Sequence, residues 1–181
     1  MILEVEIPCV FVFSPGEVSY IRKRCLVEKI RWFRVYMDDT QHQWRTELVI
    51  KRQPVTIPCT KPATDFVFNH IMHYPTLEEI NNDITDDVYT EAQSKTLLEI
   101  RDIWAAALYL QCDDFVDIMR ELMLRKLDGM SDEDADAFFA SPKGQCLERN
   151  MLEYWRSKKR QKEREREMEE REAAARLAVA Q

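Results

Sequence analysis

Residues 94–129 read SKTLLEIRDIWAAALYLQCDDFVDIMRELMLRKLDG, and this stretch decides the fold class. Apolar residues recur in it at the spacing of one helix face, which predicts a helix from Ser94, as the N-cap, to about Leu110. Its core positions are Leu97, Ile100, Trp104, Ala107 and Leu108. A second helix opens at Asp113 or Asp114, and Gly129 follows it where a C-terminal glycine is common. Its apolar set is Phe115, Ile118, Met119, Leu122, Met123 and Leu127.

The residues before this helix pair predict a small sheet and further helices. Residues 38–53 are irregular and polar, and we expect His42 and Trp44 in them to be exposed. The predicted elements are a strand at 8–13, a turn at Ser14-Pro15-Gly16, a strand at 17–21, a helix at 26–37, a short strand at 55–57, a helix at 63–74, and an acidic loop at 75–93 with room for one helical turn.

The residues after the helix pair predict two short helices and a charged tail. Ser131 caps a helix at 132–140, and Ser141-Pro142-Lys143-Gly144 interrupts the chain. A last helix starts near 145, with Leu147, Met151, Tyr154 and Trp155 on one side. Opposite charges at i,i+3 predict a solvated helix beyond 156, where apolar coiled-coil positions are missing. The apolar residues of 129–155 either fold back on 115–127 or leave a groove for a partner helix.

Composition excludes several classes of protein. The chain has 181 residues and only three glycines, which cannot build the glycine-rich loops of P-loop, Rossmann or kinase folds. The five cysteines form no C-x-x-C pair, so we expect reduced thiols rather than a disulfide framework. The N-terminus does not resemble a signal peptide, and no uncharged run approaches the 20 or so residues of a membrane span. We therefore expect a soluble protein of the cytoplasm and nucleus.

Charge is distributed unevenly along the chain, whose net charge is −7. Residues 1–64 carry 10 basic and 7 acidic groups, a net of +3, whereas residues 65–140 carry 5 and 18, a net of −13. A segment with this excess of carboxylates repels phosphate backbones, so we expect no nucleic-acid partner.

No group of residues in the sequence indicates catalysis. His70 and His73 lie one turn apart and could bind a metal with Cys59 or Cys112, but a pair without a third ligand is a weak signal. The carboxylates at 113, 114 and 117 are placed to stabilise the start of a helix. We therefore predict no enzyme activity, no metal and no cofactor; a small hydrolase or metal enzyme is a remote alternative.

The run from Trp104 to Met119 resembles the Ala-Ala-x-Tyr-Leu-x-x-x-x-Leu-x-Asp signature of the Skp family. These proteins are adaptor subunits of SCF (Skp–cullin–F-box) ubiquitin ligases, related to elongin C and BTB/POZ domains. Residues 129–139 resemble that family's Gly-x-Thr-Pro-Glu-Glu-Ile-Arg-x-x-Phe segment, with Gly129, Ser131, Glu133 and Phe139 in register. Val55-Thr-Ile-Pro58 is similar to its strand before a helix. Residues 94–140 carry the specific part of the resemblance.

The resemblance implies an α+β, BTB/POZ-like domain with a small β-sheet and a helical bundle, extended by C-terminal helices. We expect this domain at 1–128, the extension for F-box binding at 129–156, and a charged tail, helical or disordered, at 157–181. Tyr109 matches a tyrosine at the family's cullin contact, and Leu108 stands where the family usually has Asn. The implied F-box contacts are Met119, Leu122, Met123, Phe138, Phe139, Leu147, Met151 and Trp155.

The function that the resemblance implies is a non-catalytic adaptor linking F-box substrate receptors to a cullin in an SCF-type E3 ubiquitin ligase. The alternative is a BTB-like scaffold that self-associates and has lost ligase function. We expect F-box proteins and a cullin as partners, and no membrane.

Overall fold

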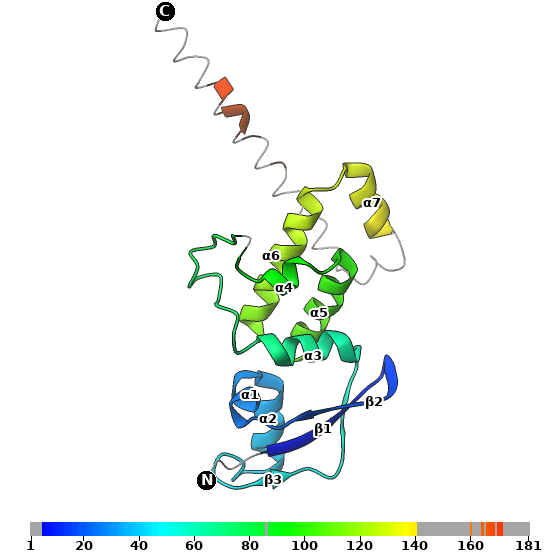
Figure 1. Ribbon diagram of the computed structural model, residues 1–181, viewed down its shortest axis with the longest axis vertical. Coiled ribbons are helices and arrows are strands. Elements are labelled where there is room, and N and C mark those ends of the chain that lie inside the picture. Colours follow the sequence, from blue (N-terminus) through cyan, green and yellow to red (C-terminus); the bar gives the residue numbers. More distant parts are fainter. Residues whose placement is uncertain are drawn as a thin grey trace, which may run out of the picture. The chain divides into compact units, whose positions relative to one another are not determined.

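The computed structural model describes residues 5–85, 87–140, 160, 164, 166–168, 170 and 171. Its contacts divide the chain into a unit of Met1–Met123 and a unit of Leu124–Gln181. The chain is mixed α and β with a small four-stranded sheet, which confirms the predicted class at this level (Figure 1). The predicted domain limits at 128 and 156 stay predictions.

The sheet begins with an antiparallel hairpin of β1 (Val5–Phe11) and β2 (Ser14–Ile21). Every second residue of β1 is buried, as a strand with one face on a core requires. The hairpin was predicted, but its turn was placed wrongly: Val12 and Phe13 form the turn, and Ser14-Pro15-Gly16 opens β2. Gly16 has φ of +83°, a conformation that glycine adopts without strain.

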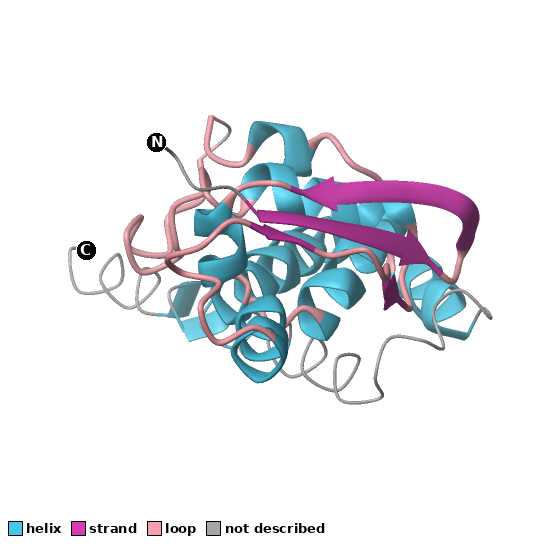
Figure 2. Ribbon diagram, turned by 90° about the horizontal axis from the view of Figure 1, so that it is seen from below, coloured by secondary structure: helices cyan, strands magenta, loops and turns pink. Residues whose placement is uncertain are grey.

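Two short strands pair with β1 in parallel and complete the sheet. β3 (Val49–Ile50) pairs with the start of β1, and β4 (Val55–Ile57) pairs with its end. Pro54 and Pro58 enclose β4 and limit its length, as predicted. Figure 2 shows β1 and β2 side by side as a twisted hairpin. The buried face of β1, formed by Val5, Ile7, Cys9 and Phe11, belongs to the core.

The predicted helix at 26–37 is two helices, α1 (Arg24–Lys29) and α2 (Arg31–Thr40). Ile30 separates them in an extended conformation, with φ of −86° and ψ of 105°. Its side chain is fully buried, as are those of Phe33 and Met37. The apolar spacing continues across the break, so the sequence pattern did not reveal it.

Trp44 is fully buried, which contradicts the expectation that it is exposed. Its indole N–H donates to Asp38 Oδ1 at 2.8 Å, and the guanidinium of Arg45 lies 4.4 Å from its ring centroid. Arg45 also bonds Asp38, and these two donors lower the pKa of the Asp38 carboxyl. Asp38 and Arg45 thus provide the polar contacts of the buried Trp44 ring. His42 is exposed as expected.

α3 (Lys61–His70) carries Pro62 in its first turn, where the missing N–H is not needed. It ends earlier than the predicted residue 74, although Phe66, Val67 and Ile71 are buried as expected. The acidic segment after it contains one short helix, α4 (Thr90–Gln93), which agrees with the predicted single turn.

α5 (Leu97–Tyr109) and α6 (Asp113–Asp128) are the predicted helix pair. Thr96, not Ser94, caps α5: its hydroxyl accepts from the N–H of Glu99, and the Glu99 carboxylate accepts from the N–H of Thr96. Ser94 instead donates to the carbonyl of Glu91. The six predicted core residues of α6 are all buried: Phe115, Ile118, Met119, Leu122, Met123 and Leu127.

The turn between α5 and α6 contains a left-handed residue, Gln111, with φ of 56°. The N–H of Gln111 donates to Leu108 O at 3.1 Å, and the N–H of Cys112 donates to Ala107 O at 3.0 Å. This pattern is a Schellman motif, in which glycine is the usual left-handed residue. α5 therefore ends with a strained non-glycine residue.

In the second unit, α7 (Asp132–Ala140) has the predicted bounds and Ser131 as its N-terminal cap, as predicted. The Ser131 hydroxyl accepts from the N–H of Asp134 at 3.1 Å and donates to its carboxylate at 2.8 Å. In the tail, Arg166 and Glu170 form an ion pair at 3.8 Å. The predicted helix near 145–155 lies outside the described residues.

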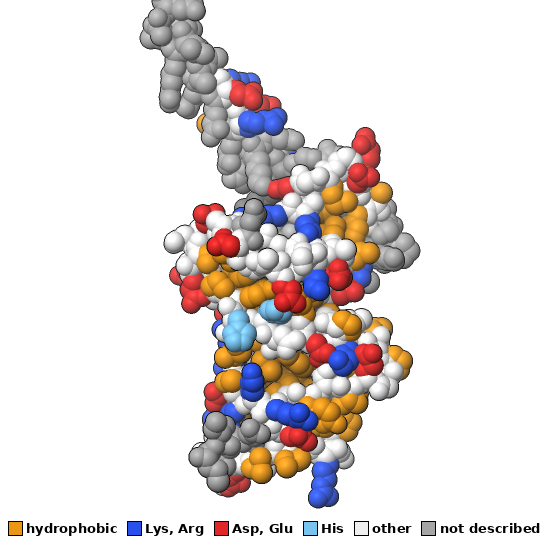
Figure 3. Space-filling model, viewed as in Figure 1, with side chains coloured by type: hydrophobic (Ala, Val, Ile, Leu, Met, Phe, Trp, Pro, Cys, Tyr) orange, Lys and Arg blue, Asp and Glu red, His pale blue; other side chains and the backbone are white. Residues whose placement is uncertain are grey.

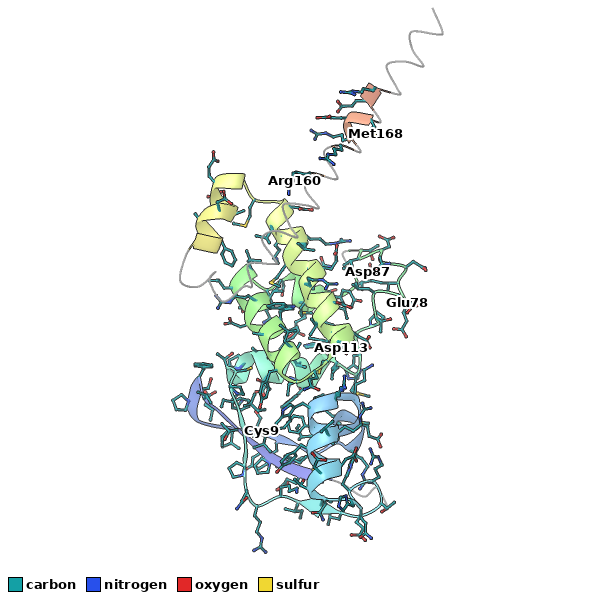
Figure 4. The ribbon with its side chains drawn as sticks, turned by 180° about the vertical axis from the view of Figure 1, so that it is seen from behind. Cys9, Glu78, Asp87, Asp113, Arg160 and Met168 are labelled. Carbon is teal, nitrogen blue, oxygen red and sulfur yellow. The ribbon has the colours of Figure 1, made fainter. Side chains whose placement is uncertain are left out.

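The four described cysteines are free; Cys25 is exposed, and Cys9, Cys59 and Cys112 are buried. Cys9 lies within β1 (Figure 4), where burial raises the pKa of its thiol from 9.0 to about 12. Burial likewise raises the pKa of the Cys112 thiol to about 12 and that of Cys59 to about 11.

These thiols predict a loss of stability in alkali. An unfolded thiol releases its proton near pH 9.0, whereas the folded chain holds it to about 12. Above pH 9 the unfolded state therefore binds fewer protons, and the free energy of unfolding falls as pH rises. Urea unfolding at about pH 8 and about pH 11 measures this fall. Exposed Cys25→Ser should leave it unchanged, and equal stability at both pH values would contradict it.

Gln111→Gly should raise the free energy of unfolding by about 1 kcal/mol, because glycine adopts the left-handed conformation without the steric cost of a Cβ. The shift in the urea midpoint measures the gain. Gln111→Ala is the matched control: it removes the same side chain but keeps the Cβ, and should give no gain. Equal effects of the two variants would show that Gln111 is not strained.

Candidate interaction surface

The last turn of α5 presents two residues singled out from the sequence, Leu108 and Tyr109. Leu108 was expected in the core, yet its side chain is 44% exposed. Tyr109 is half-buried, and its hydroxyl lies 3.5 Å from the carbonyl oxygen of Thr56 in β4. Burial raises the pKa of Tyr109.

An aromatic row joins Tyr109 to α2. The ring centroids of Trp32 and Tyr109 are 5.6 Å apart, and those of Trp32 and Tyr36 are 5.6 Å apart with the planes nearly parallel, at 9°. Trp32 also meets buried Phe33 edge to face, at 5.0 Å. The row therefore rests on the core through Trp32, and its geometry is of the kind that aromatic pairs favour.

A backbone hydrogen bond ties the two helices together at this row. The N–H of Trp32, in the first turn of α2, donates to the carbonyl of Leu110 at the C-cap of α5, at 3.2 Å. Backbone N–H groups at the start of a helix and C=O groups at its end have no partner within that helix, and this bond satisfies one of each. The bond places Trp32 beside Tyr109.

Apolar side chains flank the row. Val35, on the side of α2 that carries Trp32 and Tyr36, is 47% exposed, and Leu108 follows at the end of α5. The ammonium of Lys51 lies 5.3 Å from the ring centroid of Tyr36 and donates to Thr40 Oγ1. We call this set the Trp32 surface: Trp32, Val35, Tyr36, Leu108 and Tyr109.

The Trp32 surface consists of aromatic and aliphatic side chains, which suit binding rather than catalysis. Its aromatic side chains are half-buried and its aliphatic ones are exposed, and groups that are already held in place lose little conformational freedom on binding. Aromatic residues are also enriched among the residues that dominate interface energies. The arrangement therefore suits a protein partner.

Sequence reasoning identified two members of this surface and missed the three on α2. Trp32, Val35 and Tyr36 follow one another at the spacing of one helix side, next to the buried side that carries Phe33 and Met37. This second apolar side was the missed signal. A helix that is apolar on two sides carries more apolar surface than one core contact needs.

The residues predicted for F-box binding fall into two groups. Met119, Leu122 and Met123 are buried within the chain, and Phe138 in α7 is half-buried. The side chain of Phe139 and residues Leu147, Met151 and Trp155 lie outside the described part of the structure. The F-box site stays a prediction.

The candidate metal and acid groups have ordinary structural roles. The His70 ring packs 4.2 Å from Phe66 and 4.8 Å from Tyr74 by centroid, and its Nε2 lies 3.3 Å from Glu91. His73 is exposed. Asp113 starts α6 (Figure 4), and the next residue, Asp114, pairs with Lys29 at 3.6 Å. Among the described residues, no three His, Cys, Asp or Glu side chains come together as a metal site would require.

A scan against protein-family models finds no match to this chain, and a search of curated proteins finds none either. None of the helices in the described part of the chain is both long and apolar enough to span a membrane.

Trp32→Ala should lower the free energy of unfolding by about 2–3 kcal/mol, because the ring supports Phe33, Tyr36 and Tyr109. Urea unfolding followed by circular dichroism measures the loss. Val35→Ser, an exposed position on the same helix, should change stability by less than about 0.5 kcal/mol. Equal losses in both variants would contradict a supporting role of Trp32.

Proposed function

We propose that this protein is a non-catalytic adaptor of the Skp type, which links F-box substrate receptors to a cullin in an SCF-type E3 ubiquitin ligase. The proposal includes a BTB/POZ-like fold for the first unit. Three features support it: the hairpin with parallel strands paired to β1, the helix pair α5–α6, and the capped helix that follows.

The cullin side of the proposal is the Trp32 surface. Tyr109 stands at the position that resembles the family's cullin contact, and it belongs to an aromatic row that is preformed. The single observation that carries the proposal is that Leu108 is 44% exposed beside that row, at a helix position where core spacing predicts burial. An apolar side chain held at the surface next to ordered aromatics is typical of an interface residue.

Leu108 also implies that the cullin contact is more apolar at this position than it is in the family. The family usually has Asn here, which contributes hydrogen bonds, whereas leucine contributes only apolar area. The proposed cullin is therefore one that offers an apolar group opposite Leu108. A cullin that hydrogen-bonds to an asparagine amide at this position would find only Leu108 here. Its own polar group would then be buried without a partner, which costs about 1–3 kcal/mol.

The F-box side of the proposal rests on the resemblance over residues 129–139. Support from the fold is the helix α7, which is capped by Ser131, the residue in register with the family's threonine. Acidic residues dominate this part of the chain and favour F-box segments with basic surfaces, since opposite charge guides the choice of partner. The place of action that follows is the cytoplasm and nucleus.

Calorimetry tests the proposal by measuring binding of the 181-residue chain to cullin N-terminal domains and, separately, to a panel of F-box domains. Leu108→Asp should weaken cullin binding about tenfold or more, because a carboxylate would be buried against apolar groups. Met72→Asp is the matched control, since Met72 is 43% exposed and lies outside the Trp32 surface.

The outcomes separate the two sides. Binding to neither partner would overturn the adaptor function. Binding to F-box domains alone would overturn the cullin side and leave an adaptor outside the ligase. Equal losses for Leu108→Asp and Met72→Asp would remove the Trp32 surface from the interface.

A further inference from the structure

The turn of the β1–β2 hairpin has an unexpected composition. Two-residue turns favour Asn, Asp and Gly, yet this one consists of Val12 and Phe13, whose side chains are 51% and 67% exposed. Neither residue suits the turn, and neither contributes much to the core. Hydrophobic side chains also gather over this hairpin in Figure 3. Folding alone does not account for an apolar tip.

The tip is held rigidly. The N–H of Val12 donates to the carbonyl of Ile57 at 3.0 Å, and Ser14 Oγ accepts from the N–H of Lys61 at the start of α3, at 3.1 Å. Further along β2, the Ser19 hydroxyl donates to Asp65 Oδ1 at 2.6 Å. Phe13 therefore projects from a fixed support, and little conformational entropy is lost when it binds.

A pocket of about 300 Å³ opens beside the tip, with Ser14, the neighbour of Phe13, in its wall. This volume is at the lower end for ligand pockets and suits one aromatic side chain rather than a cofactor. Its apolar wall consists of Pro62, Ala63 and Phe66 from α3 and Ile103 from α5.

The rim of the pocket carries both signs of charge. Lys95 Nζ lies 5.7 Å from the ring centroid of Phe66 and 4.0 Å from a carboxylate oxygen of Glu99, and Asp102 completes the rim. An uncharged ring can enter without removing an ion from water. The lysine of one copy can also approach the carboxylates of another copy favourably.

We propose that a second copy of this chain occupies the pocket, so that Phe13 of each copy inserts beside Phe66 of the other. The knob and the pocket are neighbours on one surface, and a single two-fold axis near them makes both contacts at once. Such a reciprocal contact closes as a dimer and leaves no free knob for a third copy. The area buried by two tips is small, and the dimer is correspondingly weak and concentration-dependent.

This self-association uses residues outside the Trp32 surface and does not depend on the proposed adaptor function. Loss of cullin or F-box binding would leave it standing. A monomeric protein would equally leave the adaptor function standing.

Sedimentation velocity of the 181-residue chain at physiological salt tests the proposal, over about 1 to 300 μM, where a small interface is expected to associate. The weight-average sedimentation coefficient should rise from the monomer value towards the dimer value across this range. Phe13→Asp should weaken self-association about tenfold or more, because a carboxylate would enter an apolar pocket beside Glu99 and Asp102. Leu48→Asp, at a side chain that is 58% exposed, is the matched control and should have no effect.

A mixing experiment tests which groups meet. Phe13→Cys and Lys95→Cys, each in a background that also carries Cys25→Ser and Cys146→Ser, are oxidised mildly, alone and together. The mixture should give a disulfide between the two different chains, seen on a non-reducing gel, that neither chain gives alone. A protein that stays monomeric, a dimer that survives Phe13→Asp, or cross-linking of Phe13→Cys to itself would each overturn the proposal.

Discussion

The meeting of α2 with the end of α5 is the constraint on which the first unit depends. Trp32 donates its backbone N–H to Leu110, and the turn that follows uses Gln111 in a left-handed conformation to close α5 and start α6. Because Leu110 accepts this bond, the start of α2 has a fixed place beside the end of α5. That place in turn sets the tilted contact of the Trp32 and Tyr109 rings, beside which Leu108 is exposed. One backbone contact therefore positions both the core helices and the candidate interaction surface.

The sheet is attached to the helices by a second set of polar contacts. Ser14 and Ser19 of β2 bond Lys61 and Asp65 of α3, and Lys61 pairs with Asp65 within the helix. These bonds replace water on half-buried groups and give the hairpin one orientation, whereas apolar contacts alone specify orientation less well. Because the hairpin is already ordered, its exposed tip loses little conformational entropy when it binds. The two surfaces of the first unit, the Trp32 surface and the hairpin tip, thus share a common origin in elements that are fixed before a partner arrives.

Errors in sequence-based expectation occurred where tertiary contacts overrode a local pattern. The turn was expected at Ser14-Pro15-Gly16 because those residues favour turns, but β1 pairs in a register that places Val12 and Phe13 at the tip. The helix at 26–37 is interrupted because the side chain of Ile30 is buried with its backbone extended, which helical spacing does not reveal. Trp44 is surrounded by polar residues in sequence, and its burial depends on Asp38 and Arg45 folding over it. In each case the outcome depends on backbone pairing or side-chain packing, which apolar spacing and turn propensity do not encode.

The sequence by itself determined the mixed class, the hairpin, the short strand at 55–57, the helix pair and the cap at Ser131. All of these follow from local signals, namely alternation, the 3.6-residue period, proline limits and capping residues. Only the tertiary structure decided that Leu108 is exposed, that Trp32 and Tyr36 join Tyr109, and that a pocket opens beside Phe13. The physical reason is distance along the chain. Residues 32 and 109, or 14 and 103, meet through packing of several elements, and no local pattern encodes which faces of those elements will come together.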